Sequence, residues 1–221
     1  GGTSNRSLNA SGSSISANQF LSAGFTYDLV SIKGTAAGHG AFSDVTARKV
    51  VFTDPNVASL NGINGANNQL DSVEFMGGGR IYGTNNTIGT LIFFPGSRYT
   101  FTAGTNTTIT GDWYGSGTPC RLTEIVSAGP ANATVTMTSG NVNFDYVRFQ
   151  QMTATGGAAF TAGSHSQDLG GSTGWDIAPY DGASPIMGFG TDLTVCADGF
   201  PIVLNTDGFF AGPSATYVWS D

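Results

Sequence analysis

The feature that most constrains this chain is a series of short apolar runs that recur along much of its length. Equivalent positions in these runs are occupied by Phe52, Phe75, Phe93, Ile109 and Ile125. The interval between them is irregular but stays at roughly 20 residues, which is within the range of solenoid repeats. One short strand per interval is typical of a coiled β-solenoid, in which each strand stacks on the equivalent strand of the next turn. The spacing therefore predicts an all-β fold, a parallel β-helix.

Helix signals are nearly absent, because glycine interrupts almost every part of the chain and no long stretch has a helical period. Strand-like runs of β-branched and aromatic residues are bounded by Gly, Asn, Asp and Pro. The alternative architecture is a β-sandwich of hairpins, which needs a turn about every 8–12 residues. That spacing fits residues 99–110 and 134–149 but not the first half of the chain, so the solenoid is favoured.

The balance of charge excludes several classes of function. The chain has 8 Lys and Arg against 15 Asp and Glu, a formal net charge of −7. Nucleic-acid binding and polybasic membrane contact both need clustered cations, and the sequence has no such cluster. No apolar run approaches the roughly 20 residues of a membrane-spanning helix. We therefore expect neither a nucleic-acid partner nor membrane insertion.

The polar positions are filled by Gly, Thr, Ser and Asn, while charged residues make up only 10% of the chain. An ordinary soluble domain has about 25% charged residues. This composition is typical of long-lived extracellular β proteins, so we expect an extracellular or bacterial cell-surface location. Residues 1–14 lack the apolar run of a signal peptide, which suggests a mature or excised piece.

A linker separates two predicted regions. Residues 178–189 contain two prolines and two glycines, and the β-helix is expected over residues 1–177. Residues 190–221 are too few to enclose a core alone, because domains below about 40 residues usually need disulfides, metals or partners. These residues either pack on the first domain or begin a second one.

A series of motifs runs in a characteristic order through residues 88–177. The motifs occupy residues 91–96, 99–101, 108–111, 134–136, 142–147, 154–157 and 168–175. In this order they resemble a module of secreted multidomain surface proteins from Bacteroidetes-type bacteria. The resemblance implies the last turns of a right-handed parallel β-helix, closed by a glycine-rich segment in which Trp175 is a buried structural residue.

The last part of the chain resembles a different module. Residues 190–196, 202–204 and 215–221 are similar to the first third of an immunoglobulin-like (PKD-like) repeat found in the same kind of protein. The resemblance implies that Trp219 packs in the sandwich core and that Cys196 pairs with a cysteine near the end of the repeat. The sequence stops before that cysteine, so we expect a truncated domain and leave the pairing open.

Tandem modules of this kind are typical of gliding-motility proteins and other surface adhesins exported by the type IX system. The resemblance implies further domains of the same polypeptide, the type IX secretion machinery and a polysaccharide or cell-surface ligand as partners. The second cysteine, Cys120, is either free or bridged to Cys196.

Catalysis is the main alternative, because parallel β-helices include polysaccharide lyases and glycosidases. A glycosidase needs two carboxylates held about 5–10 Å apart. Asp54, Asp71 and Glu74 are the nearest candidates, yet Asp commonly caps the corners of turns. A lyase needs a basic residue near a sugar carboxylate, and the arginines are isolated in sequence at Arg80, Arg98, Arg121 and Arg148. We therefore expect no catalytic residue.

Metal and phosphate sites have no basis in the sequence. His39 and His165 lie far apart, without the spacing of metal ligands or the context of a catalytic triad. Residues 77–79 are three glycines, but no lysine or helix follows them, so a tight corner of the solenoid is the better interpretation. We expect no metal and no cofactor.

Two surface roles remain as hypotheses. Trp113 and Tyr114 are candidate carbohydrate contacts, since aromatic rings stack on sugar faces, although an inward rung residue beside an exposed neighbour is the simpler interpretation. Residues 71–73, Asp-Ser-Val, resemble a short O-glycan acceptor, which makes Ser72 a candidate modification site. The function expected from all these features is structural and adhesive, in a segment of a large secreted or cell-surface protein.

Overall fold

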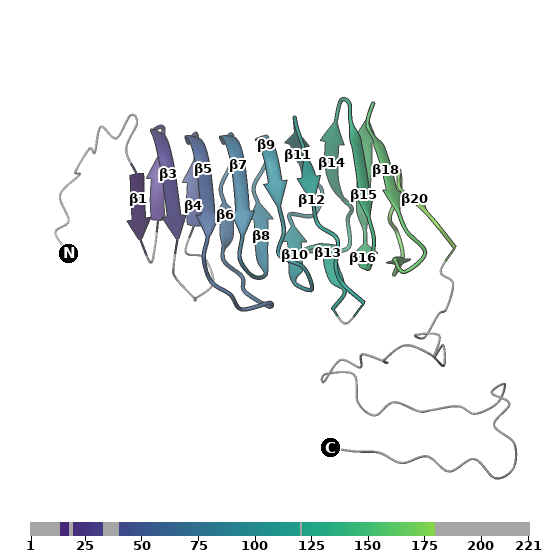
Figure 1. Ribbon diagram of the computed structural model, residues 1–221. Coiled ribbons are helices and arrows are strands. Elements are labelled where there is room, and N and C mark those ends of the chain that lie inside the picture. The colour runs from purple at the N-terminus through teal and green to yellow at the C-terminus, as the bar shows by residue number, and fades with distance from the viewer. Residues whose placement is uncertain (1–13, 18–19, 33–39, 120, 180–221) are drawn as a thin grey trace, which may run out of the picture. The chain divides into compact units, whose positions relative to one another are not determined.

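The computed structural model describes residues 14–17, 20–32, 40–119 and 121–179. Every regular element in these ranges is a β-strand, and all ladders between named strands are parallel. The strands coil into a β-solenoid of about seven turns (Figure 1). The prediction of a parallel β-helix is therefore confirmed over this part of the chain, and the sandwich of hairpins is wrong there.

The largest sheet, sheet 1, has nine strands and takes at least one strand from each turn. Its strands are β1 (Ser14–Ala17), β3 (Thr26–Ile32), β5 (Thr46–Phe52), β7 (Gln69–Phe75), β9 (Asn86–Ile92), β11 (Asn106–Ile109), β14 (Ala133–Met137) and β17 (Met152–Gly156), with β12 (Trp113–Tyr114) paired to β9.

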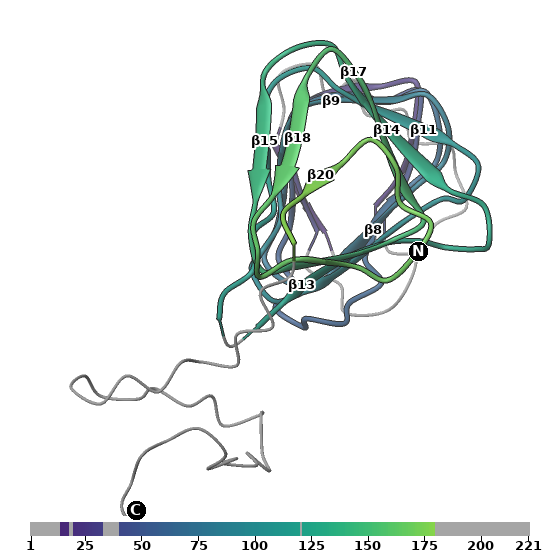
Figure 2. The same cartoon turned by 90° about the vertical axis from the view of Figure 1, so that its right-hand side faces the viewer.

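Two smaller sheets complete most of each turn. Sheet 2 comprises β6 (Gly62–Asn64), β8 (Gly79–Tyr82), β10 (Arg98–Phe101), β13 (Thr123–Ser127), β16 (Val147–Gln150) and β19 (Gln167–Asp168). Sheet 3 comprises β15 (Asn141–Phe144), β18 (Ala159–Ala162) and β20 (Asp176–Ile177). A separate pair joins β2 (Phe20–Ala23) to β4 (Gly40–Ser43). Figure 2 looks along the coil and shows β9 and β14, β8 and β13, and β15 and β18 on three different sides.

The interior is filled by ladders of apolar side chains, because equivalent positions of successive turns point inward together. Phe52 is in register with Phe75, and their rings stack with centroids 4.7 Å apart. Phe93 continues this ladder, 5.8 Å from Phe75 in an edge-to-face contact. Phe42 extends it in the other direction, 6.2 Å from Phe52. The predicted equivalence of Phe52, Phe75 and Phe93 is thus confirmed.

The last two steps of the predicted spacing, to Ile109 and Ile125, are wrong. Ile109 is in register with Ile88 rather than with Phe93, and Ile125 lies on sheet 2 in register with Tyr99. A turn of this coil contributes strands to more than one sheet, so consecutive apolar runs alternate between sheets. The interval from Phe93 to Ile109 is short because Ile109 lies earlier along sheet 1 than the position equivalent to Phe93, which follows Tyr114. The interval from Ile109 to Ile125 is short because it runs from sheet 1 to sheet 2 and is not a complete turn.

Asparagines form a second ladder inside one corner, between sheet 2 and sheet 1. Asn68 and Asn86 are buried, and the Asn68 side-chain amide donates to Asn86 Oδ1 at 2.8 Å. Asn67 and Asn85, which precede these two residues, and Asp44, which is equivalent to Asn67 in the previous turn, all have φ between 54° and 60°. Asn and Asp tolerate this left-handed conformation better than other non-glycine residues. The corner residues thus turn the chain while the buried amides satisfy backbone groups inside it.

Glycine is required where two turns approach each other too closely for a side chain. A Cβ atom on Gly156 would lie 1.9 Å from the backbone oxygen of Met137, and Gly156 has a φ of 106°. Gly140 has a similar φ of 99°, but a Cβ atom there would meet nothing within 4 Å. A comparison of the two glycines therefore distinguishes the cost of backbone strain from the cost of the steric contact.

We expect Gly156→Ala to lower the free energy of unfolding by about 2–3 kcal/mol, because strain and a displaced backbone contact add together. The matched variant Gly140→Ala carries the strain alone and should cost about 1 kcal/mol. Urea denaturation followed by circular dichroism measures both values. Equal losses in the two variants would show that the contact with Met137 contributes nothing.

The predicted second domain lies outside the described residues. The structure describes the first two residues of the predicted linker, Ala178 and Pro179, and none of residues 190–221. Cys120 and Cys196, for which a bridge was left open, and Trp219 also lie outside the described residues. The immunoglobulin-like assignment therefore stays a prediction.

Candidate functional site

Trp113 and Tyr114, the candidate carbohydrate contacts, differ sharply in their burial. Trp113 is 3% exposed and packs edge-to-face on Phe93 and Phe144, so its ring is not presented to a ligand. Tyr114 is 56% exposed and is in register with Ile92 of β9. Of these two residues, only Tyr114 therefore remains a candidate carbohydrate contact.

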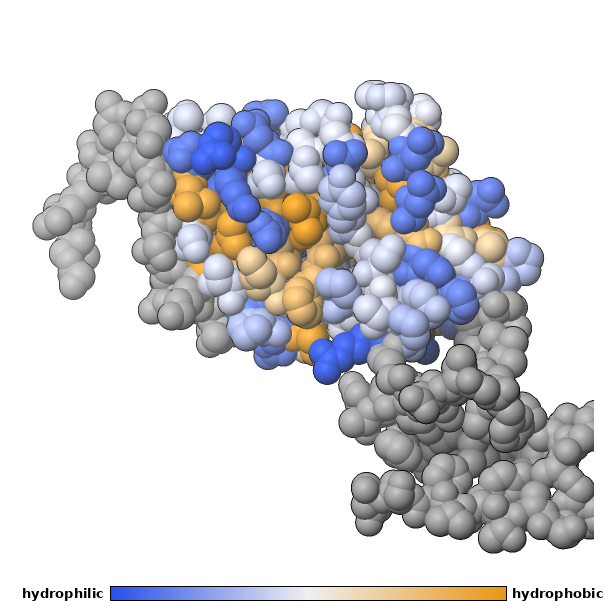
Figure 3. All heavy atoms as spheres, in the orientation of Figure 1, coloured by the Kyte–Doolittle hydropathy of each residue, from blue (hydrophilic) through white to orange (hydrophobic). Residues whose placement is uncertain are grey.

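Exposed apolar side chains also occur close to β9, the strand to which β12 is paired. Figure 3 shows apolar residues gathered over β5, β7 and β9. Large hydrophobic residues exposed after the ends of these strands are Val57, Leu60, Met76 and Phe94. A tyrosine ring has an apolar face and a polar tip, so an exposed Tyr114 has the character of a weak stacking platform.

Ser72, the candidate O-glycosylation site, is half-buried in the middle of β7, in register with Thr90. Its neighbour Asp71 is exposed. Glycosylation at Ser72 stays a prediction. The other residue singled out for structure, Trp175, packs against the core, with its ring 4.2 Å from Phe149.

The carboxylates considered for catalysis are not paired with one another. Asp54 is buried in the loop after β5, and its Oδ1 accepts a hydrogen bond from the backbone N–H of Asn56 at 3.1 Å. Glu74 forms an ion pair with Lys49, with Oε2 and Nζ 2.7 Å apart. Asp71 is exposed on β7. These contacts are those of a turn cap and a surface ion pair.

Arginines that are far apart in sequence meet on sheet 2. Arg98, Glu124 and Arg148 occupy one register position on β10, β13 and β16. Arg80 on β8 is in register with Thr100, two positions along β10 from Arg98. We call Arg80, Arg98 and Arg148 the arginine row. Sequence spacing did not reveal it, because the turns that separate its members differ in length.

The arginine row is only partly neutralised. Arg98 Nη1 donates to Glu124 Oε2 at 2.7 Å. The guanidinium of Arg80 lies over the ring of Tyr82, with its central carbon 5.0 Å from the ring centroid. The Nε atoms of Arg80 and Arg148 are buried, and neither has a hydrogen-bond partner in the part of the chain that the structure describes. Two of the three guanidinium groups thus carry a charge that no described carboxylate neutralises.

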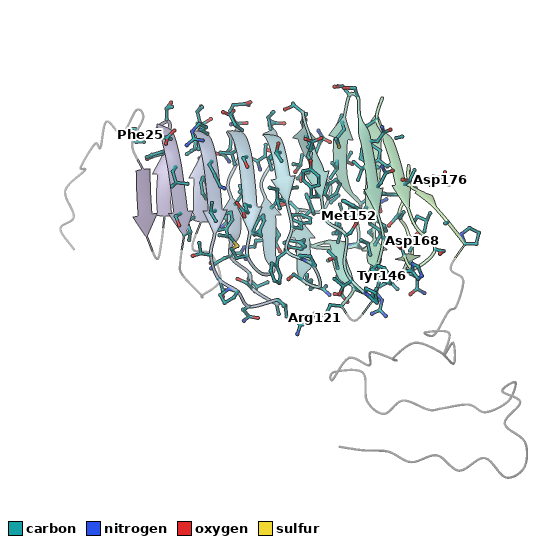
Figure 4. All side chains as sticks on the ribbon, viewed as in Figure 1. Phe25, Arg121, Tyr146, Met152, Asp168 and Asp176 are labelled. Atoms are coloured by element: carbon teal, nitrogen blue, oxygen red, sulfur yellow. The ribbon has the colours of Figure 1, made fainter. Side chains whose placement is uncertain are left out.

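A histidine and an aspartate meet at the corner that leads into β16. His165 Nδ1 lies 2.9 Å from Asp145 Oδ2, although the two residues are 20 apart in sequence. The ring of Tyr146 stacks on His165, with centroids 4.4 Å apart. Figure 4 shows Tyr146 on the same lower edge of the coil as Arg121. Sequence reasoning did not find this contact, because it did not compare polar residues that lie one turn of the solenoid apart.

In the described part of the chain, perturbed pKa values outside the arginine row occur at two places, the Asp28–Arg48 pair and Tyr99, and both have structural causes. The side-chain hydrogen bond from Arg48 holds the pKa of Asp28 below its ordinary value. Burial raises the pKa of Tyr99, whose hydroxyl donates to the backbone oxygen of Gly77 at 2.7 Å. Both shifts thus follow from contacts that stabilise the coil.

Within the described ranges, no three His, Cys, Asp or Glu side chains gather as a metal site would require. No helix long and apolar enough to cross a membrane occurs there either. Comparison of the chain with protein-family models, with curated proteins and with solved structures finds no match. The assignment of function therefore rests on the surface chemistry of the coil itself.

Proposed function

We propose that this chain is a structural and adhesive module of a large secreted or cell-surface protein, without catalysis. The observation that supports this proposal is the continuous stack of apolar ladders from β3 to β18, in a chain that carries few charges. Such a stack needs no cofactor and leaves long regular faces available for contact.

Polar ladders along sheet 1 support the same proposal. Thr87, Thr108, Thr136 and Thr155 occupy one register position on four successive strands of sheet 1. The hydroxyls of Thr136 and Thr155 lie 3.1 Å apart, and Thr136 also donates to Asn106 Oδ1 at 2.7 Å. Cross-strand threonine pairs stabilise a sheet without charge, which suits a protein that must persist outside the cell.

The finer parts of the proposal come from the sequence resemblance. The coil is right-handed and is followed by an immunoglobulin-like domain and further domains of the same polypeptide. The whole protein is exported by the type IX secretion machinery, acts in cell adhesion or gliding motility, and meets polysaccharides or other cell-surface ligands outside the cell.

Binding to immobilised polysaccharides tests the adhesive function. We expect the purified chain to be retained by at least one neutral or charged polysaccharide in affinity electrophoresis, with the length of the polysaccharide unchanged. Retention should fall when the contacting residue is removed, for example in Tyr114→Ala if stacking contributes. A chain that is retained by none of the polysaccharides contradicts the proposal.

A second candidate function is a polysaccharide lyase, and the contact between His165 and Asp145 favours it. Arg148 is in register with Gln167, which lies close to His165 in sequence. In such a reaction a base takes the C5 proton next to a uronate carboxylate, the C4–O bond breaks and a C4=C5 double bond forms, while the leaving sugar oxygen takes up a proton from water. This double bond absorbs ultraviolet light. An increase in absorbance that is abolished in His165→Ala would show that the chain is a lyase and would contradict the proposal of a module without catalysis.

A further inference from the structure

The described cations divide into two groups with different surroundings. On sheet 1, Arg48 forms an ion pair with Asp28, and Lys49 forms one with Glu74. The remaining described cations lie on or next to sheet 2 and are Arg80, Arg98, Arg121 and Arg148. A chain of net charge −7 thus places most of its described positive charge on one side. Charge complementarity makes that side the natural contact for an anion.

The arginine row has a geometry that suits a linear ligand. Neighbouring strands of a sheet lie about 4.8 Å apart, so Arg98 and Arg148, which are two strands apart, are separated by about 10 Å along the coil. Glu124 stands between them and binds Arg98. A compact anion can reach only one guanidinium, whereas an extended chain with charges at intervals can reach several.

From this arrangement we propose that the arginine row binds a carboxylated polysaccharide that runs across the strands of sheet 2. The inference rests on the adhesive function proposed above and names the class of its ligand. The planar guanidinium presents paired N–H donors that match a carboxylate in a bidentate contact. Neither Arg80 nor Arg148 forms an ion pair within the described part of the chain, so both charges are available to a carboxylate.

The neighbouring side chains fit a sugar chain better than a nucleic acid. Thr100, Gln150 and Gln167 lie on the same sheet and offer neutral hydrogen-bonding groups for hydroxyls. Tyr82 adds an aromatic ring beside Arg80. Three arginines with a glutamate among them are too few for the closely spaced phosphates of a nucleic acid, whose binding depends on neutralising many charges. Carboxylates spaced along a polyuronate require fewer cations.

Affinity for polygalacturonate, measured by biolayer interferometry with the immobilised chain, tests the proposal. We expect Arg148→Ala and Arg80→Gln each to raise the Kd about tenfold, because each removes a charge-assisted contact. Arg98→Ala should have a smaller effect, because Arg98 is already paired with Glu124. The matched control is Arg48→Ala, since Arg48 is also an exposed arginine but lies on sheet 1, and its Kd should be unchanged. Circular dichroism melting of every variant establishes that the coil is intact.

Three further probes distinguish the outcomes. Preferential binding of polygalacturonate over neutral glucan, with similar loss in Arg148→Ala and Arg80→Gln, supports the proposal. Tighter binding of dextran sulfate or of polyglutamate than of polygalacturonate overturns the carboxylated-sugar class. Retention of neutral glucan alone, insensitive to the arginine variants, overturns the inference while the adhesive function stands, whereas binding to none of the probes removes both.

Discussion

Trp113→Ala is expected to lower the free energy of unfolding by about 3–5 kcal/mol, as removal of a buried tryptophan usually does. The Trp113 ring contacts four aromatic side chains from separate segments of the coil, and its centroid lies 5.8 Å from Phe93, 6.1 Å from Phe101, 5.1 Å from Phe144 and 5.8 Å from Trp175. It therefore joins the central phenylalanine ladder to the aromatic cluster of the last turns. Alanine would leave a cavity that these neighbours, held in separate segments of the coil, cannot fill together.

The adjacent residue provides the control for this prediction. Tyr114 lies on the same two-residue strand but is 56% exposed, so Tyr114→Ala should change the free energy of unfolding by less than about 1 kcal/mol. Urea denaturation monitored by far-ultraviolet circular dichroism compares the two variants under identical conditions. Similar losses in both would mean that the core does not depend on the Trp113 ring.

The interior of the coil could be predicted from the sequence because it obeys a simple rule. An inward position in every turn must be apolar, so Phe52, Phe75 and Phe93 mark the register by their type alone. The same rule misled the assignment of Ile109 and Ile125, since a turn contains several inward positions, both along one strand and on a second sheet. Apolar type identifies an inward residue but not which inward position of the turn it occupies.

The outer face could not be predicted in the same way. An outward position accepts any polar residue, so no residue type marks it. Arg98 and Glu124 are 26 residues apart but Asp145 and His165 only 20, although each pair spans one turn. Loops of variable length separate the strands, and they decide which polar side chains become neighbours. The loop lengths therefore decide which arginines line up in the arginine row, and this alignment is visible only in the three-dimensional structure.

Burial also distinguished two residues that sequence reasoning treated together. Trp113 and Tyr114 are equally aromatic, and strict alternation along a strand requires that only one of them faces solvent. The sequence does not contain a marker for which one, because both types occur inside and outside. The structure assigns Trp113 to the core and Tyr114 to the surface.

The second large effect is expected at the buried asparagine ladder. The Asn68 side chain accepts a hydrogen bond from the backbone N–H of Val45 at 3.1 Å and donates to the backbone oxygen of Phe42 at 3.2 Å. It also donates to Asn86 Oδ1 at 2.8 Å. Asn68→Ala removes all three bonds, and with them the side-chain acceptor of the Val45 N–H and a donor to the backbone oxygen of Phe42. Because each unsatisfied buried group costs about 1–3 kcal/mol, we expect a loss of about 3–5 kcal/mol in the free energy of unfolding.

Asn64→Ala is the matched control, since Asn64 is exposed on the neighbouring strand β6 and should contribute less than about 0.5 kcal/mol. Chemical denaturation gives both free energies, and amide hydrogen exchange at Val45 reports the local consequence. Exchange at Val45 should become faster in Asn68→Ala and stay unchanged in Asn64→Ala, because only the first variant removes its acceptor. A stable Asn68→Ala variant with a protected Val45 amide would mean that water or a shifted backbone replaces the side chain, and that the corner is held by its left-handed residues rather than by the buried amides.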